Sequence, residues 1–183
     1  MIWKNYILSA LCLAVQTCLA TNATVVVNYN GKVLDEPGQL VNIPESHNTP
    51  TFGLTQLPPS TGPFVLIMVD QGKSDILHLI QSDLHLSPQE ITVADTSYYS
   101  LSSQSKPDAK YIAPTPLLPP KVHKYVELLF VQPEGFKIPR KFKKYMPGLV
   151  PNRLNFPLDE FVEETGLGES VAESYFNEKQ VLT

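Results

Sequence analysis

Short apolar runs, separated by proline, glycine and asparagine, dominate the hydrophobic pattern of this chain. The most continuous run, 64–69 (FVLIMV), is too short for an ordinary helix and predicts a strand buried on both faces. The β-branched run 24–29 is followed by Asn30-Gly31, which predicts a strand that ends in a turn. Similar but weaker patterns predict further strands at 39–43, 76–80, 91–93 and 124–131.

Helical spacing is confined to the C-terminal end of the chain. The segment 158–165 predicts a short helix that ends at Gly166. A second helix is predicted over 169–176, because Val171, Ser174 and Tyr175 recur at i, i+3 and i+4. The segments 47–63 and 95–120 are rich in proline and predict irregular chain. Many strands followed by terminal helices predict a mostly β, β-rich α+β fold.

The N-terminus has the three parts of a secretory signal. Lys4 supplies the positive charge, 6–15 is apolar apart from Ser9, and Cys18 and Ala20 stand at −3 and −1 of a cut after residue 20. The alternative is an uncleaved anchor, although the apolar run is shorter than the roughly 20 residues that span a bilayer. We therefore predict a signal peptide over 1–20 and one domain over 21–183, located in the secretory pathway or outside the cell.

Charge and cysteine content narrow the possible functions. The formal net charge is −4 and becomes −5 once Lys4 is removed, so electrostatics give no reason to expect nucleic-acid binding. Cys12 and Cys18 both lie in the predicted signal, and stability therefore has to come from core packing rather than a disulfide. Asn22 begins an N-glycosylation sequon. We predict a monomer with no cofactor and no transmembrane segment.

Two polar residues interrupt or end apolar strands. Asp70 closes the run 64–69, where a carboxylate is costly unless it is hydrogen-bonded or faces a cavity. The alternative is an aspartate that initiates a turn, because Gln71-Gly72 follows. His78 lies inside the apolar segment 76–80, and either a hydrogen-bonded core histidine or a ligand-binding one fits that position.

The segment 111–125 combines a proline-rich loop with a histidine at the start of a strand. Its prolines stiffen the loop, so it could line a pocket at little ordering cost, with His123 beside it. A plain surface loop is the alternative. A basic cluster at 137–144 could meet an anionic surface, or be a solvated loop balanced by acidic residues at 159–178. Because the known nucleophile, phosphate-loop and metal motifs are missing from the sequence, neither a metal site nor enzymatic activity is predicted.

Several blocks together resemble the phosphatidylethanolamine-binding protein family. The strongest is 111–132, which is similar to that family's Gly-Pro-x-Pro-Pro loop, His-Arg-Tyr and apolar strand ending in Phe-x-Gln. Here these stand as Ala113-Pro114-Thr115-Pro116, His123-Lys124-Tyr125 and Phe130-Val131-Gln132. The C-terminal blocks 153–156, 167–168 and 171–176 also match, and the order of all blocks along the chain is that of the family.

The resemblance implies a β-sandwich-like fold with peripheral helices and a small pocket that binds anions, such as phosphate or a phospholipid headgroup. It also implies which positions line that pocket, with Tyr175 placed where a C-terminal helix would close it. Carried over by position, the ligand-binding residues are Asp70, His78, Ala113, Pro114, His123, Tyr125 and Tyr175.

The sequence departs from the family pattern around Asp70. The family's Asp-Pro-Asp-x-Pro motif stands here as 70–74 (DQGKS), Leu79 replaces the tryptophan after the first histidine, and Lys124 replaces the arginine after the second. The leading hypothesis is therefore a secreted anion- or headgroup-binding domain. The alternative is a protein-interaction module, such as an inhibitor of a secreted or vacuolar protease, with a degenerate pocket.

Overall fold

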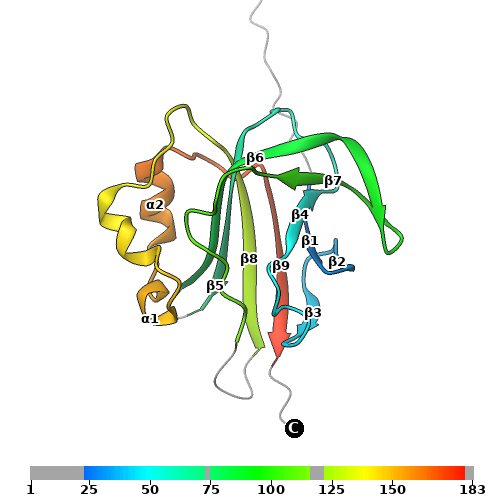
Figure 1. The fold of residues 1–183 in the computed structure, drawn as a ribbon, viewed down its shortest axis with the longest axis horizontal. Helices are drawn as coiled ribbons and strands as arrows, with labels where there is room; N and C mark the ends of the chain where they lie inside the picture. The colour runs from blue at the N-terminus through cyan, green and yellow to red at the C-terminus, as the bar shows by residue number, and fades with distance from the viewer. Residues whose placement is uncertain (1–22, 73–74, 116–121, 180–183) are drawn as a thin grey trace, which may run out of the picture.

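The computed structural model describes residues 23–72, 75–115 and 122–179. Its strands form one sheet in the order β2-β1-β4-β7-β6-β5-β8-β9-β3 (Figure 1). The strand bounds are β1 Val25–Tyr29, β2 Lys32–Leu34, β3 Gln39–Asn42, β4 Thr51–Leu54, β5 Phe64–Gln71, β6 Ile76–Val93, β7 Thr96–Ser102, β8 Val122–Val131 and β9 Ala172–Lys179.

The long strand β6 joins two halves of the sheet. Its first part pairs with β5 and its second part pairs with β7, so the sheet folds over along β6. Ala94 and Asp95, with φ of 48° and 68°, form the tight turn between β6 and β7. A parallel bridge between Thr24 and Glu173 brings β1 close to β9. The result is a nearly closed sheet rather than a sandwich of two separate sheets.

Two apolar cores lie on opposite faces of the β5-β8-β9 part of this sheet. Alternate residues of β8 serve each core: Tyr125 and Leu129 point inward, between the two halves, and Phe130 points outward. The outward core is covered by η1 Arg140–Tyr145, α1 Val150–Arg153 and α2 Leu158–Thr165, which lie on one side of the molecule (Figure 1). The inward core lies between the two halves of the sheet, where polar residues are not expected unless they have hydrogen-bond partners.

The mostly β fold predicted from the sequence is confirmed. The runs at 24–29, 39–43, 64–69 and 124–131 correspond to β1, β3, β5 and β8, and the helix at 158–165 is α2. The predicted strands at 76–80 and 91–93 are the two ends of β6. Gly166, in the left-handed region at φ 69°, ends α2 as expected.

The second C-terminal helix, predicted over 169–176, is wrong. These residues lead into β9, which pairs antiparallel with β8 and parallel with β3. Burial along β9 alternates with period two: Ala172, Ser174, Phe176 and Glu178 are buried, and the residues between them are more exposed. The helical spacing that motivated the prediction was coincidental, because tertiary pairing with β8 decides the conformation.

The irregular segments were also predicted too broadly. Residues 96–102 form β7, whose Tyr98 and Leu101 are buried, and residues 51–54 form β4. Prolines nearby concealed these short strands. Among the described residues, no helix is long and apolar enough to cross a membrane. The predicted signal peptide and Asn22 lie outside the described residues.

Candidate functional site

Asp70 and His123 meet at the open end of neighbouring strands. Asp70 is near the end of β5, His123 is near the start of β8, and the antiparallel pairing brings both to the same edge. Asp70 Oδ2 lies 2.7 Å from His123 Nδ1. The Asp70 side chain is 7% exposed and the His123 side chain 27%, so the carboxylate is covered while the imidazole reaches solvent.

The hydrogen bond to Asp70 fixes how His123 can act. A carboxylate accepts, so Nδ1 of His123 donates, and Nε2 is the ring nitrogen that this hydrogen bond leaves available. Neutral His123 offers a lone pair at Nε2, and protonated His123 offers an N–H donor there. The protonated form is the one suited to an anionic oxygen.

His78 is held differently. Its Nδ1 lies 2.6 Å from the carbonyl oxygen of Ile112, which can only accept, so this nitrogen carries a proton. Burial lowers the pKa of His78, with further contributions from Arg153 and His123. His78 is therefore neutral at physiological pH, and its Nε2 is an acceptor rather than a donor.

Tyr125 connects the two histidines. Its ring makes an edge-on contact with His78, with ring centroids 5.1 Å apart, and stacks against His123 at 6.3 Å. On its other side it stacks on Phe176 of β9 at 5.2 Å. Burial raises the pKa of Tyr125, so its hydroxyl stays protonated. The aromatic stack holds both imidazoles in place.

Ala113 and Pro114 lie beside His78. The segment before them is hydrogen-bonded to β6, because Ile112 donates its backbone N–H to the His78 carbonyl at 2.9 Å. Ala113 is half-buried and Pro114 is buried. Their role as a pocket wall stays a prediction, and residues 116–121 lie outside the described residues.

Tyr175 is not brought to this cluster. It lies on the opposite face of β9 from Phe176 and Glu178, where the Lys124 ammonium sits 4.4 Å from its ring centroid. Its expected position rested on a C-terminal helix that the chain does not form. The structure therefore groups Asp70, His78, His123 and Tyr125, with Ala113 and Pro114 following the Ile112 that is bonded to His78, and separates Tyr175 from them.

Sequence reasoning missed Glu178, a fully buried carboxyl on β9. It is the cross-strand neighbour of His123, and both of its oxygens lie 3.1 Å from the Ser46 hydroxyl. Burial raises the pKa of Glu178 to about 7. A backbone carbonyl of Ser46 accepts from the Tyr111 hydroxyl at 2.6 Å, so polar groups continue inward from the histidine. Glu178 was missed because the sequence predicted a helix over 169–176 and no strand after it, whereas pairing of β9 with β8 places Glu178 beside His123.

A second buried acid, Glu127, lies farther along the inward face of β8. It is fully buried, and neither carboxylate oxygen has a hydrogen-bond partner among the described residues. Burial raises its pKa well above the ordinary value, so Glu127 is uncharged in the folded protein. The signal for it was visible in the sequence as a lone acid within an apolar strand.

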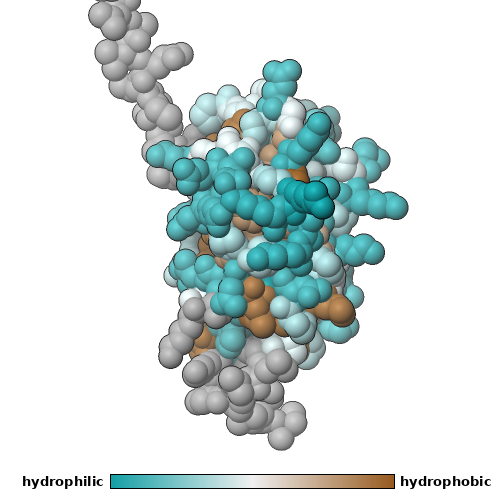
Figure 2. Space-filling view, turned by 90° about the vertical axis from the view of Figure 1, so that its left-hand side faces the viewer, coloured by the Kyte–Doolittle hydropathy of each residue, from teal (hydrophilic) through white to brown (hydrophobic). Residues whose placement is uncertain are grey.

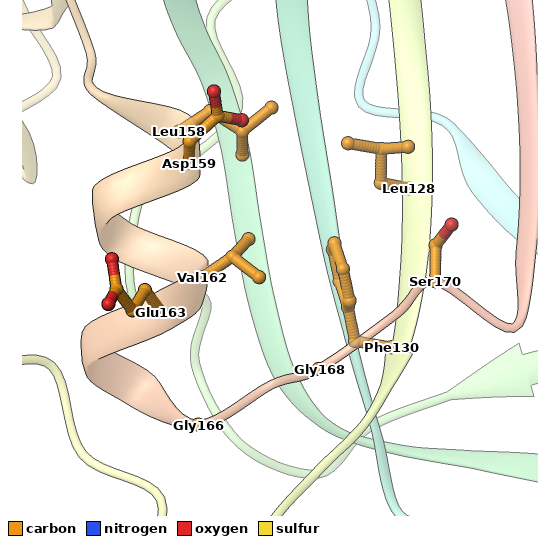
Figure 3. A pocket seen from close by; sticks show the side chains of 9 residues that line it. All are labelled: Leu128, Phe130, Leu158, Asp159, Val162, Glu163, Gly166, Gly168 and Ser170. Atoms are coloured by element: carbon orange, nitrogen blue, oxygen red, sulfur yellow. The ribbon is translucent and has the colours of Figure 1, made fainter.

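Two grooves lie elsewhere on the described surface. One, of about 570 Å³, runs between α2 and β8, where Val162 faces Phe130 and Leu128, and Glu163 points away from the strand (Figure 3). The other, of about 790 Å³, is lined by polar and apolar residues including Asp108 and Lys137. Neither includes Asp70 or His123. The surface on the helical side is largely hydrophilic, with small apolar patches (Figure 2).

The chemistry of the Asp70–His123 site is that of a hydrogen-bond donor to a small anion. Carboxyl groups lie near the two histidines, but the described part of the chain contains no group of three or more side chains that could hold a metal ion. The site therefore offers a solvent-facing imidazole, two aromatic rings and a carboxyl that titrates near neutral pH.

Two curated fungal proteins, both described as phomoidride biosynthesis cluster protein N, are similar in sequence. The protein from Talaromyces stipitatus is 37% identical over 124 residues, covering 64% of this chain and 59% of its own length. That from Fungal sp. is 36% identical over 103 residues, covering 55% of this chain and 43% of its own. The chain thus spans less than two thirds of the length of either relative.

Solved structures agree on the fold. A carboxypeptidase Y inhibitor, solved in complex with its cognate proteinase, matches with a TM-score of 0.63 at 20% identity, over 87% of this chain and 84% of that one. A phosphatidylethanolamine-binding protein from Plasmodium vivax matches with a TM-score of 0.54 at 12% identity, over 87% and 86%. The family model described as phosphatidylethanolamine-binding protein matches residues 26–181, and the chain belongs to that family.

Proposed function

We propose that this domain binds a small anion beside His123, either free phosphate or the phosphate of a phospholipid headgroup. The observation that carries the proposal is the 2.7 Å hydrogen bond from His123 Nδ1 to Asp70, which leaves Nε2 of a partly exposed imidazole available to a ligand. A protonated imidazole held in this way makes charge-assisted hydrogen bonds to phosphate oxygens.

The geometry assigns the two histidines unequal parts in this proposal. His123 is the donor, because Asp70 accepts from its Nδ1 and the protonated imidazole carries a second N–H at Nε2. His78 supports the wall through Ile112 and Tyr125, and as a neutral imidazole it presents an acceptor at Nε2. Binding should therefore weaken as pH rises through the titration range of an imidazole, near pH 6.5.

We further propose that the protein binds the anion without catalysing a reaction, and that it is exported from the cell. The basis for export is the charge, apolar run and small-residue exit of residues 1–20. A cleaved form beginning near residue 21, found in the medium of expressing cells, would support it. Full-length protein retained inside those cells would contradict it.

Isothermal titration at pH 6 tests the anion site. We expect saturable heat with phosphate and with phosphoethanolamine in the unaltered protein and in His85→Ala, an exposed histidine away from the site. His123→Ala should weaken binding by at least about tenfold, the effect of losing one charge-assisted hydrogen bond. Equal affinity in His123→Ala, or no heat in the unaltered protein, would contradict the proposal.

The source of the phosphate is a separate question with its own measurement. Sedimentation with vesicles of phosphatidylcholine alone and with added phosphatidylethanolamine distinguishes a lipid headgroup from a free anion. Binding only to the mixed vesicles, lost in His123→Ala, would identify the headgroup. Phosphate binding without vesicle binding would identify the free anion.

Inhibition of a protease is the second candidate, favoured by the likeness to the carboxypeptidase Y inhibitor. At 20% identity that likeness establishes the fold alone. The candidate is tested by assaying serine carboxypeptidases with increasing amounts of the protein. Inhibition that survives His123→Ala would place protease contacts away from the anion site, and no inhibition of any enzyme would remove this candidate.

A further inference from the structure

Glu178 occupies a position that couples it to the proposed anion site. It is the direct cross-strand neighbour of His123 in the antiparallel β8–β9 pair, and both side chains project from the same face. Directly opposed residues have Cβ atoms about 5 Å apart. An anion bound at His123 would therefore have as its neighbour a carboxyl group that is shielded from water and that senses the charge of His123.

The hydrogen bonds around Glu178 accommodate both of its protonation states. The Ser46 hydroxyl has a single proton but three acceptors within 3.2 Å, namely both Glu178 oxygens and the Ile43 carbonyl. When Glu178 is protonated, it can donate to Ser46 while Ser46 donates to Ile43. When Glu178 is ionised, Ser46 donates to the carboxylate, and this hydrogen bond lowers the Glu178 pKa.

The groups around Glu178 shift its pKa in opposite directions. Burial raises its pKa to about 7, the hydrogen bond from Ser46 and the charge of His123 lower it, and Glu45 and Asp70 raise it. On the neighbouring elements, Glu127 of β8 is buried and uncharged, and Tyr29 and Tyr111 keep their protons. Val41 of β3, which pairs with Glu178, carries no charge. His123 is thus the cation that faces Glu178.

We propose that Glu178 determines the specificity of the His123 site, which accepts an anion only when Glu178 carries its proton. This inference rests on the proposed function. An ionised Glu178 would repel a second negative charge at short range in a water-poor environment, and it would also compete for His123. A protonated Glu178 is neutral and leaves His123 free to bind the anion.

The inference predicts that anion binding takes up protons at two groups, His123 and Glu178. Sulfate is a suitable probe, because its charge stays constant over the whole range from pH 5.5 to 8.5. Measured at constant ionic strength, binding should lose affinity with pH more steeply than one titrating group allows, approaching about two protons per sulfate above pH 7.5. At pH 8, a Glu178 pKa of about 7 leaves roughly a tenth of the sites competent.

Glu178→Gln provides the test. Its carboxamide can donate to Ser46 as the protonated acid does, but it never becomes negative. We expect this variant to bind sulfate about tenfold more tightly than the unaltered protein at pH 8, equally well at pH 5.5, and with uptake of at most about one proton. The matched control is Glu173→Gln, an exposed residue of the same strand on the opposite face, which should keep the steep dependence.

A second variant keeps the inference falsifiable if Glu178→Gln does not fold. Ser46→Ala removes the hydrogen bond that lowers the Glu178 pKa, so sulfate binding should persist to higher pH. A Glu178→Gln variant with unchanged pH dependence, or a Ser46→Ala variant whose binding fades at lower pH, would overturn the role of Glu178 while the anion site stands. A protein that binds neither sulfate nor phosphate at pH 5.5 would overturn the anion site itself.

Discussion

Buried ionisable side chains lie on both faces of the β5-β8-β9 sheet, and they are hydrogen-bonded to very different extents. On the helical side, Arg153 is fully buried and has no ion-pair partner among the described residues. Its guanidinium donates to four backbone carbonyls, those of Pro147 at 2.6 Å, Met146 at 3.0 Å, Lys110 at 3.1 Å and Leu77 at 3.3 Å. Burial lowers its pKa to about 10, which keeps it charged at neutral pH.

On the inward face, the buried acids are poorly paired. Glu127 has no hydrogen-bond partner among the described residues, and Glu178 shares one hydroxyl proton between two oxygens. A buried ionisable group whose hydrogen bonds are all made connects the segments that it contacts. A buried group without hydrogen-bond partners lowers stability, so its presence calls for another explanation. The difference indicates that Arg153 holds the fold, and it agrees with the role that we propose for Glu178.

The largest expected effect is the loss of Arg153. Arg153→Ala removes the donor of four backbone carbonyls and detaches α1 from β6, so the free energy of unfolding should fall by about 3–5 kcal/mol. Arg153→Lys should recover only part of it, because an ammonium cannot reproduce the planar fork. Urea unfolding followed by circular dichroism measures both. A loss below about 1 kcal/mol would show that Arg153 does not hold the fold.

Replacing Glu127 should raise the free energy of unfolding, whereas replacing Arg153 should lower it. Glu127→Leu exchanges an unpaired acid for an apolar group of similar size in an apolar core, and we expect a gain of about 1–3 kcal/mol in the free energy of unfolding. The same urea experiment detects it. A loss of stability would mean that Glu127 has partners in solution that the folded chain alone does not display.

The pH dependence of stability follows from the same two acids. Their folded pKa values are raised, so the folded state binds more protons than the unfolded state above the ordinary glutamate pKa of about 4.5. The stability that they contribute is complete below that pH and is lost as the pH rises, through about 7 for Glu178. We expect the melting temperature to fall between pH 5 and 8 and the fall to be shallower in Glu178→Gln. A melting temperature that rises over this range would contradict these assignments.

The smallest effect is expected at the exposed surface of the helical side. Lys141 contacts Glu160 and Glu164 of α2 at 2.5 Å and 2.6 Å, but all three side chains are well exposed. Solvent and salt screen such pairs. Lys141→Ala should therefore leave the melting temperature within error of that of the unaltered protein at 0.15 M salt. A large drop would mean that exposed ion pairs also stabilise the helical side, and the contrast between Arg153 and the inward acids would then be incomplete.

Most of the fold could be predicted from the sequence, because its strongest strands are continuous apolar runs such as 64–69. The prediction failed where the spacing of apolar residues and the tertiary contacts favour different secondary structures. Residues 169–176 satisfy a helical spacing by chance, and only pairing with β8 makes them a strand. The short strands β4 and β7 lie among prolines and polar residues, where single-residue preferences favour loops.

Part of the candidate cluster could be predicted from the sequence. Asp70, His78 and His123 stand out because they mark the ends or interruptions of apolar strands, Tyr125 was added by the family resemblance, and the structure brings the four together. Tyr175 was misplaced because a helix was assigned to 169–176, and Glu178 was missed because no strand was predicted beyond that helix. The unequal bonding of the two histidines depends on Ile112 and Asp70 in three dimensions, which no sequence spacing reveals.

The most direct test of the anion site is nitrogen-15 NMR of the histidine rings during a phosphate titration at pH 6. Resonances are assigned to His123 by their loss in His123→Ala. The account predicts that Nε2 of His123 shifts with phosphate in a saturable way, while the rings of the exposed His47 and His85 do not. Shifts confined to His47 or His85, or a His123 ring that does not respond, would contradict it.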